Sequence, residues 1–356
     1  MKRTKIIKLE EMNEKQIDEI LTACGEMIRE GKTVAFPTET VYGLGANALD
    51  SKAINKIFVA KGRPSDNPLI VHVAHRVEVD ALVRVIPEKA KKLMAHFWPG
   101  PLTLVMEKSH GIPGEISAGL STVAIRMPVH PIARTLIEKA GVPVAAPSAN
   151  TSGKPSPTRA AHVIQDLRGK VDAIIAGGPC DVGVESTVLD VTEETPMILR
   201  PGGVTKEMLE AVIGEVALDP GLYHRGEMKD VPRSPGMKYT HYAPKAKVII
   251  IEGVEAAVVR KIREMVAYYK EKGLSVGVIV TDESLAYYDQ VEECCVKSMG
   301  SRQNPETIAN NLFRVLREFD ETNVAIILSE AVEEVGIGQA VMNRLMKAAG
   351  NEKINA

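Results

Sequence analysis

Short apolar runs recur through the N-terminal part of the chain and predict β-strands. Apolar residues at helical spacing predict helices between them, and Thr158 stands where the last of these would have its N-cap. Because strands outnumber helices and alternate with them only loosely, we predict an α/β fold in which helices flank a twisted mixed sheet. The strands lie at residues 34–36, 69–73, 102–106, 123–127, 144–146, 173–176, 187–191 and 197–199, and the helices at residues 17–28, 88–96, 131–140 and 158–167.

The pattern changes after Gly214. Residues 217–244 are rich in Pro, Gly, Arg, Lys and Tyr and have no sustained period, so they predict a long loop, which in a compact protein is often functional. Beyond the loop, strands at residues 248–251, 276–280 and 324–328 alternate with helices at 256–269, from Asn304-Pro305 onward, and at 338–349. This alternation predicts a small Rossmann-like domain with a parallel sheet. The predicted divisions are residues 1–216, a linker at 217–246 and a C-terminal domain at 247–356.

Composition narrows the functional class. The chain has 356 residues and a formal net charge of −2, which disfavours a protein that coats nucleic acid or an acidic membrane. Its four cysteines (Cys24, Cys180, Cys294 and Cys295) lack a C-x-x-C spacing, so we expect idle thiols in a reducing cytoplasm rather than a zinc site. The basic N-terminus is followed by too short an apolar run for a signal peptide, and no run approaches the roughly 20 residues of a membrane span.

Two turns at predicted strand ends carry candidate chemistry. Lys61-Gly62-Arg63-Pro64 precedes one strand, and Gly and Pro would fix the directions of its two cations. Ser148 and Asn150 follow another strand with a hydroxyl and an amide. Arg presents a planar fork to phosphate or carboxylate, and Lys presents a point charge. An anion site is one interpretation, and a solvated surface pair is the other.

Further candidates remain ambiguous on residue type alone. Residues 37–45 hold two threonines and two glycines that could approach a polar ligand, or they could form a tight turn with Tyr42 in the core. His72 and Arg126 lie within apolar strands, where a buried charge needs a partner such as a bound anion. Arg200 ends another strand. Basic residues gathered at one sheet edge suit phosphoryl or nucleotidyl chemistry. The chain lacks a Walker A loop, a nucleophile elbow and a zinc-protease motif.

These segments together resemble the YrdC family in its long form. The resemblance covers about residues 10–215, and residues 234–244 with the α/β tail resemble the family's linker and extra domain. The segments that carry it, in order, are Phe36-Pro37-Thr38-Glu39-Thr40-Val41-Tyr42-Gly43-Leu44-Gly45, Lys61-Gly62-Arg63-Pro64, Asn67-Pro68-Leu69, Trp98-Pro99-Gly100-Pro101-Leu102-Thr103, Val123-Ala124-Ile125-Arg126-Met127-Pro128, Ala146-Pro147-Ser148-Ala149-Asn150 and Ser186-Thr187.

The resemblance implies an enzyme, a nucleotidyltransferase that makes threonylcarbamoyl-AMP and pyrophosphate from ATP, L-threonine and bicarbonate. A partner tRNA threonylcarbamoyl transferase would then modify tRNA, without stable tRNA binding by this chain. Mg²⁺ would accompany ATP, and its protein ligands are unknown; Glu39 and Glu185 are the candidates. The chemistry requires no protein nucleophile, and the sequence offers none. It requires cations that hold carbamate, carboxylate and triphosphate together.

The resemblance also assigns residues to ligands. L-Threonine would be bound by Thr40, His72, Arg126 and Ser186, with Arg126 on its carboxylate. Lys238 and Tyr242 would belong to a lid, and Thr240 stands there where the resemblance predicts a basic residue. ATP would be bound by Lys61, Arg63, Asn67, Thr122, Ala146, Ser148, Asn150, Ser156, Arg200, Tyr239 and His241.

Two alternative functions stay open on the sequence. One is the YrdC-like module of a hydrogenase-maturation carbamoyltransferase, which predicts acylphosphatase and zinc-finger segments before residue 10. The other is an RNA-binding module, which predicts a basic face and steep salt dependence. The sequence gives neither the oligomeric state nor the role of the C-terminal domain.

Overall fold

The structure is a computed structural model that describes residues 2–222, 232–233, 241–289 and 294–356. The chain forms two compact units, which are described separately. Unit 1 comprises Met1–Ser152 and Ser156–Tyr239, and unit 2 comprises Gly153–Pro155 and Thr240–Ala356. In the part of the chain that the structure describes, no helix is both long and apolar enough to cross a membrane.

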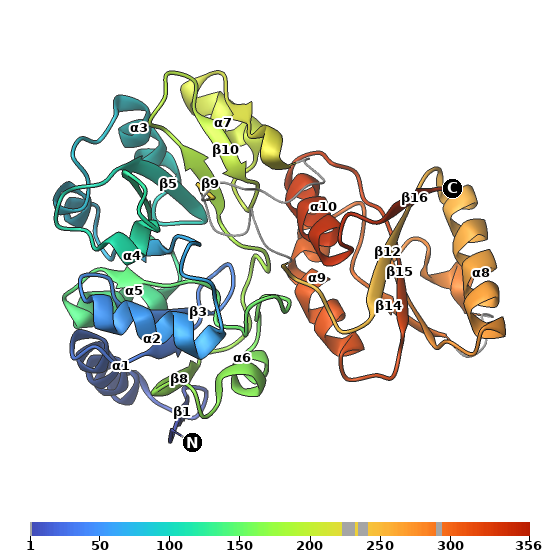
Figure 1. Cartoon of the computed structure of the whole chain (residues 1–356), viewed down its shortest axis with the longest axis horizontal. Helices are drawn as coiled ribbons and strands as arrows, with labels where there is room; N and C mark the ends of the chain where they lie inside the picture. Colours follow the sequence, from blue (N-terminus) through green and yellow to red (C-terminus); the bar gives the residue numbers. More distant parts are fainter. Residues whose placement is uncertain (1, 223–231, 234–240, 290–293) are drawn as a thin grey trace. The chain divides into compact units, whose positions relative to one another are not determined.

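Unit 1 is built on a mixed sheet, as the sequence predicts (Figure 1). The strand order is β1-β8-β2-β3-β7-β4-β6-β5-β9-β10-β11, with parallel and antiparallel pairs intermixed. The strands are β1 (Lys5–Lys8), β2 (Val34–Phe36), β3 (Gly43–Asn47), β4 (Ile70–His72), β5 (Leu102–Glu107), β6 (Thr122–Arg126), β7 (Val144–Ala145), β8 (Ala173–Ala176), β9 (Thr187–Asp190), β10 (Met197–Arg200) and β11 (Ala217–Leu218).

Helices cover both faces of this sheet. α1 begins at a capping box on Asn13 and packs against α5, which begins with Pro131 at its first turn. These two helices share an apolar cluster with Phe36, Val144 and other strand residues. The helices are α1 (Glu14–Arg29), α2 (Ser51–Lys61), α3 (Glu88–Phe97), α4 (Gly114–Ser117), α5 (Pro131–Ala140), α6 (Ala160–Leu167) and α7 (Lys206–Ile213), with 3-10 turns η1 (Arg76–Ala81) and η2 (Pro220–Leu222).

The opposite face carries the larger core. Ile54 and Phe58 of α2, Leu93 of α3 and Val163 of α6 pack there against alternate strand residues such as Ile125. On the first face, beyond the part that α1 and α5 cover, a separate cluster consists of strand residues alone. Its buried members are Ile70, Val105, Ala124, Val188 and Leu199. We call this part of the sheet surface, which the cluster of Ile70, Val105, Ala124, Val188 and Leu199 marks, the open face. Polar side chains can lie beside apolar ones on this face.

Unit 2 is a five-stranded, all-parallel sheet in the order β14-β13-β15-β12-β16, which confirms the predicted Rossmann-like domain. α8 lies on one face, and α9 and α10 lie on the other (Figure 1). The elements are β12 (Lys247–Glu252), α8 (Glu255–Glu271), β13 (Val276–Val280), η3 (Leu285–Tyr288), β14 (Cys295–Ser298), α9 (Pro305–Phe319), β15 (Ile326–Glu330), α10 (Ile337–Ala348) and β16 (Lys353–Asn355).

Three local predictions are wrong. Thr158 does not cap α6, whose N-cap is Arg159 without a side-chain cap. The predicted loop at 217–244 begins inside the sheet, because Ala217 and Leu218 pair with β10 as β11. Lys61 does not lie on a turn: it is the last residue of α2, and Gly62 follows it in the left-handed conformation at φ 61°.

Candidate active site

Lys61 joins the two segments that the sequence singles out. Its side chain is 2% exposed, and Nζ donates to the carbonyl oxygens of Ser148 and Asn150, the latter at 2.6 Å, and to Asn150 Oδ1 at 3.2 Å. Ser148 Oγ donates to the same Oδ1 at 2.6 Å. The ammonium therefore fixes the 148–150 turn against the end of α2, and the two predicted anion-binding turns form one structure.

Arg63 and Asn67 lie in the following loop. Arg63 Nη2 donates to the carbonyl oxygens of Asn67 (3.3 Å) and Pro68 (3.0 Å). Asn67 is 1% exposed, and its Oδ1 and Nδ2 find no hydrogen-bond partner among the described residues. An unpaired buried amide costs about 1–3 kcal/mol. A ligand that supplies both a donor and an acceptor would remove that cost.

Arg126 lies on the open face of the sheet. His72, Arg126 and Thr103 are opposite one another on β4, β6 and β5, so their side chains share a face. Arg126 Nη1 donates to Thr40 Oγ1 at 2.9 Å and Nε donates to Gly100 O at 3.3 Å. Nη2 lies 2.6 Å from Oε1 of the buried Glu39, an ion pair without the geometry of a hydrogen bond. The structure thus brings Thr40, His72 and Arg126 together.

Ser186 and Arg200 meet beside this group. Arg200 Nε and Nη2 donate to the carbonyl oxygen of Ser186 at 3.1 and 3.0 Å, and Nη2 lies 3.2 Å from Ser186 Oγ. Ser186 Oγ is also 2.8 Å from Thr103 Oγ1. A register shift between Ile198 and Arg200 interrupts the pairing of β10 with β9. Arg200 therefore positions Ser186 and its loop.

The other predicted residues are more dispersed. Ala146 follows β7, where its N–H donates to Ile70 O at 3.0 Å, and Thr122 begins β6 opposite Glu107. Ser156 Oγ donates to Glu185 Oε1 at 2.5 Å, and both side chains are buried. His241 and Tyr242 belong to unit 2, where the Tyr242 ring packs on Phe313 at 5.1 Å between centroids. Lys238 and Tyr239 lie outside the described residues.

Two candidate residues escaped sequence reasoning. In β5, Leu102 and Leu104 face the large core, and Thr103 between them faces the opposite side of the sheet. Because successive side chains of a strand point to opposite faces, this placement could have been predicted from the sequence. His130 lies just before α5. Burial lowers its pKa, while the carboxylates of Glu39 and Asp181 act in the opposite direction. No pattern in the sequence indicates that proximity.

Of the two glycines in residues 37–45, Gly45 is required by packing. Gly43 and Gly45 lie on β3 opposite Phe36 and Val34, and a Cβ at Gly45 would meet the Phe36 ring at 2.7 Å. Tyr42 is fully buried and its hydroxyl donates to Gly178 O at 2.6 Å. The core interpretation of Tyr42 is therefore right.

His72 is neutral over the whole physiological range. Burial, and then the charge of Arg126, lower its pKa from 6.5 to about 3. At neutral pH the imidazole therefore adds no second positive charge beside the guanidinium. Its Nδ1 lies 3.2 Å from Ile70 O.

This shift predicts a pH-dependent stability. The unfolded chain takes up a proton at His72 near pH 6.5, but the folded chain does so only near pH 3, so the free energy of unfolding falls as the pH drops through that interval. Urea titrations at pH 7, 6, 5 and 4 should show that His72→Asn loses stability less steeply than wild type. The control is His75→Asn, at an exposed histidine. Identical slopes for wild type and His72→Asn would contradict the prediction.

Comparisons with known proteins cover both units. A family model described as "Telomere recombination" matches residues 26–202, and one described as "Threonylcarbamoyl-AMP synthase, C-terminal domain" matches residues 204–350. A threonylcarbamoyl-AMP synthase of Pyrococcus abyssi is 55% identical over 328 residues, which is 91% of this chain and 92% of the relative. One of Bacillus subtilis is 51% identical over 338 residues, which is 95% of each.

A solved structure extends the likeness to three dimensions. P. abyssi Sua5 complexed with L-threonine has a TM-score of 0.92 and 52% identity to this chain, and the match covers 99% of this chain and 100% of that one. The family models, the relatives and the solved structure agree over both units. The chain therefore belongs to the threonylcarbamoyl-AMP synthase family.

Proposed function

We propose that this chain makes threonylcarbamoyl-AMP and pyrophosphate from ATP, L-threonine and bicarbonate, for threonylcarbamoyladenosine modification of tRNA. The observation that carries the proposal is the placement of Lys61, Arg63, Arg126 and Arg200, all buried and all held by carbonyl oxygens of the backbone. These bonds fix the orientation of each cation, and Arg126 also pairs with the carboxylate of Glu39. Such a set suits the binding of several anionic groups at once.

The threonine subsite follows from the Arg126 contacts. The guanidinium would take the substrate carboxylate in a bidentate pair, with Thr40 and Ser186 supplying hydroxyls and His72 a neutral imidazole. The amine of threonine, once deprotonated, reacts with bicarbonate to give a carbamate and water. A carbamate oxygen then attacks the α-phosphorus of ATP and pyrophosphate leaves, which makes the enzyme a nucleotidyltransferase. No step needs a protein nucleophile.

The nucleotide subsite would use the segments that Lys61 joins. Lys61, Arg63, Ser148, Asn150 and Arg200 would hold ATP, and the unpaired Asn67 amide would meet one of its polar groups. Thr122, Ala146 and Ser156 would line the same site. Tyr239 and His241 would also bind ATP. Lys238 and Tyr242 would belong to a lid.

Magnesium would enter with ATP. In the described part of the chain, no three His, Cys, Asp or Glu side chains stand close enough to hold a metal. Glu39 contacts Arg126, and Glu185 accepts a hydrogen bond from Ser156, so neither resembles a dedicated ligand. Mg²⁺ commonly keeps several waters and binds through substrate phosphates. We therefore assign its ligands mainly to the triphosphate.

The product implies a partner. A mixed carbamic–phosphoric anhydride is labile, so a tRNA threonylcarbamoyl transferase would take it over directly. Because the formal net charge is −2, we do not expect this chain itself to bind tRNA stably. Its four free cysteines suit a reducing compartment, which supports a cytoplasmic location.

The reaction is tested by omission. The purified chain is incubated with MgATP, L-threonine and ¹³C-bicarbonate, and pyrophosphate release is measured while the adenylate is identified by mass spectrometry. We expect release to require all three substrates and the adenylate to carry one ¹³C. Equal release without threonine would reject the reaction.

A further inference from the structure

The connections between the strands of unit 2 reverse direction between β13 and β15. β13 leads to β14 on one side of the pair, whereas β15 leads through α10 to β16 on the other side. Neighbouring parallel strands whose connections leave in opposite directions create a crevice outside their carboxyl ends, and ligands of open α/β sheets bind there. This position belongs to unit 2.

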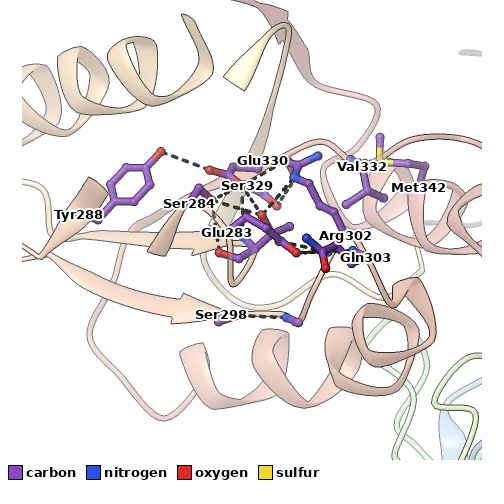
Figure 2. Close-up of polar contacts among 12 residues, drawn as sticks. Glu283, Ser284, Tyr288, Ser298, Arg302, Gln303, Ser329, Glu330, Val332 and Met342 are labelled. Carbon is purple, nitrogen blue, oxygen red and sulfur yellow. Dashed lines mark hydrogen bonds and ion pairs between the residues drawn. The ribbon is translucent and has the colours of Figure 1, made fainter. Parts of the chain in front are cut away.

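A buried carboxylate organises the residues at this crevice. Glu330 is 1% exposed and accepts hydrogen bonds from Thr281 N (3.1 Å), Ser284 Oγ (2.7 Å) and Arg302 Nη2 (3.1 Å), with Tyr288 OH at 3.4 Å from its other oxygen (Figure 2). Arg302 Nε also donates to Thr281 Oγ1 at 3.1 Å. The guanidinium is thus held along one edge, while its side chain remains 34% exposed.

A second carboxylate fixes the backbone before α9. Glu283 Oε1 accepts hydrogen bonds from Ser301 Oγ at 2.6 Å and from Arg302 N at 2.9 Å. Partial burial opposes ionisation of Glu283, but these hydrogen bonds outweigh it and hold the pKa at about 2. The loop that carries Arg302 is therefore anchored at both its backbone and its side chain. Such support from neighbouring groups keeps a binding side chain in one orientation.

A cavity of about 240 Å³ opens beside this guanidinium. That volume is below the roughly 300–1,000 Å³ of sites for drug-sized ligands, so a small metabolite fits better. Two charged residues of opposite sign, Arg302 and Glu333, line the cavity together with an apolar set from α9, the loop after β15 and α10. The apolar set is Pro305, Ile308, Val332, Val335 and Val341.

We propose that this cavity binds a small zwitterionic α-amino acid with an apolar side chain. Arg302 takes the carboxylate, Glu333 takes the ammonium group, and the apolar set receives the side chain. The acid of Glu333 disfavours a phosphate group, and the charged pair disfavours a purely apolar ligand. The proposal gives unit 2 a binding function of its own and does not rest on the reaction proposed for unit 1.

The test uses L-isoleucine as the probe and the full chain as the protein. Equilibrium dialysis of ¹⁴C-L-isoleucine is done without L-threonine, because threonine is itself a small zwitterionic α-amino acid and would compete for this cavity. The variants in unit 2 distinguish the cavity from the amino-acid site proposed in unit 1. We expect saturable binding of one isoleucine per chain. Binding should weaken about tenfold in Glu333→Gln, the usual effect of losing one hydrogen bond to a charged group. Glu334→Gln is the matched control, because Glu334 is next to Glu333 in the sequence but does not line the cavity.

Two further arms locate the site and define the ligand. Val335→Asp places a charge in the apolar set at a side chain that is 70% exposed, so folding is not disturbed, and it should abolish binding. 3-Methylpentanoate, which lacks the amine, should compete at least tenfold less well than L-isoleucine if one charged hydrogen bond is missing. Absence of saturable binding, unchanged binding in Glu333→Gln or Val335→Asp, or equal competition by 3-methylpentanoate would each overturn the proposal.

Discussion

Lys61→Met should lower kcat/KM for threonine-dependent pyrophosphate release by about 10²–10³-fold, the loss typical of removing one preorganised charge from an active site. Nζ is buried and bonded to the carbonyl oxygens of Ser148 and Asn150. Without it these carbonyls lose their charged donor, and the 148–150 turn loses its attachment to α2. The variant then loses both the charge that we propose binds ATP and the position of Ser148 and Asn150.

The control for Lys61 lies on the same helix. Lys56 also donates to a backbone carbonyl oxygen, but this is the oxygen of Gly31, at 2.6 Å, and not one of the 148–150 turn. Lys56→Met should therefore leave kcat/KM unchanged. Initial rates of pyrophosphate release at varied ATP, with circular dichroism to verify folding, give the comparison. A folded Lys61→Met protein that retains more than half of the wild-type kcat/KM would contradict our assignment.

The position of Lys61 shows what the sequence reveals and what it hides. Its chemistry was apparent from the residue types, and Asp50 and Gly62 were available as cap signals for α2. Its partners were not, because Ser148 and Asn150 are nearly ninety residues away in the chain. Local patterns predict elements and chemical groups. The contacts that decide whether a cation binds a ligand or braces a turn come from the tertiary fold.

The same limit applies to the sheet. Short apolar runs predicted the strands, and the period of two could also place Ile70 and His72 on one face. The strand order could not be read, since β4 pairs with β6 and β7 rather than with its neighbours in sequence. For that reason the sequence left Gly45 open as a possible ligand contact, although its missing Cβ makes room for Phe36 of the adjacent strand. Likewise, Glu39 is buried beside Arg126 only because the fold brings the segment after β2 close to the end of β6.

Arg126→Leu should abolish threonine-dependent turnover and also destabilise unit 1. The variant lacks the proposed partner of the threonine carboxylate, so kcat/KM for threonine should fall at least about 10²–10³-fold. It also leaves Glu39 buried without its counter-charge, and breaking a buried ion pair in this way costs about 3–5 kcal/mol. The loss of stability is measured by urea unfolding, and the loss of activity by pyrophosphate release at saturating ATP.

The double variant Arg126→Leu/Glu39→Gln separates these two effects. A neutral amide at position 39 removes the buried charge that Arg126→Leu leaves without a partner. We therefore expect the free energy of unfolding to recover most of its loss. Activity should not return, because the guanidinium that we propose binds the threonine carboxylate is still missing. Arg84→Leu serves as the control, since it breaks an exposed pair with Glu107 on β5 and should change neither property. If the double variant regained turnover as well as stability, Arg126 would be a structural partner of Glu39, and the threonine carboxylate would have to bind elsewhere.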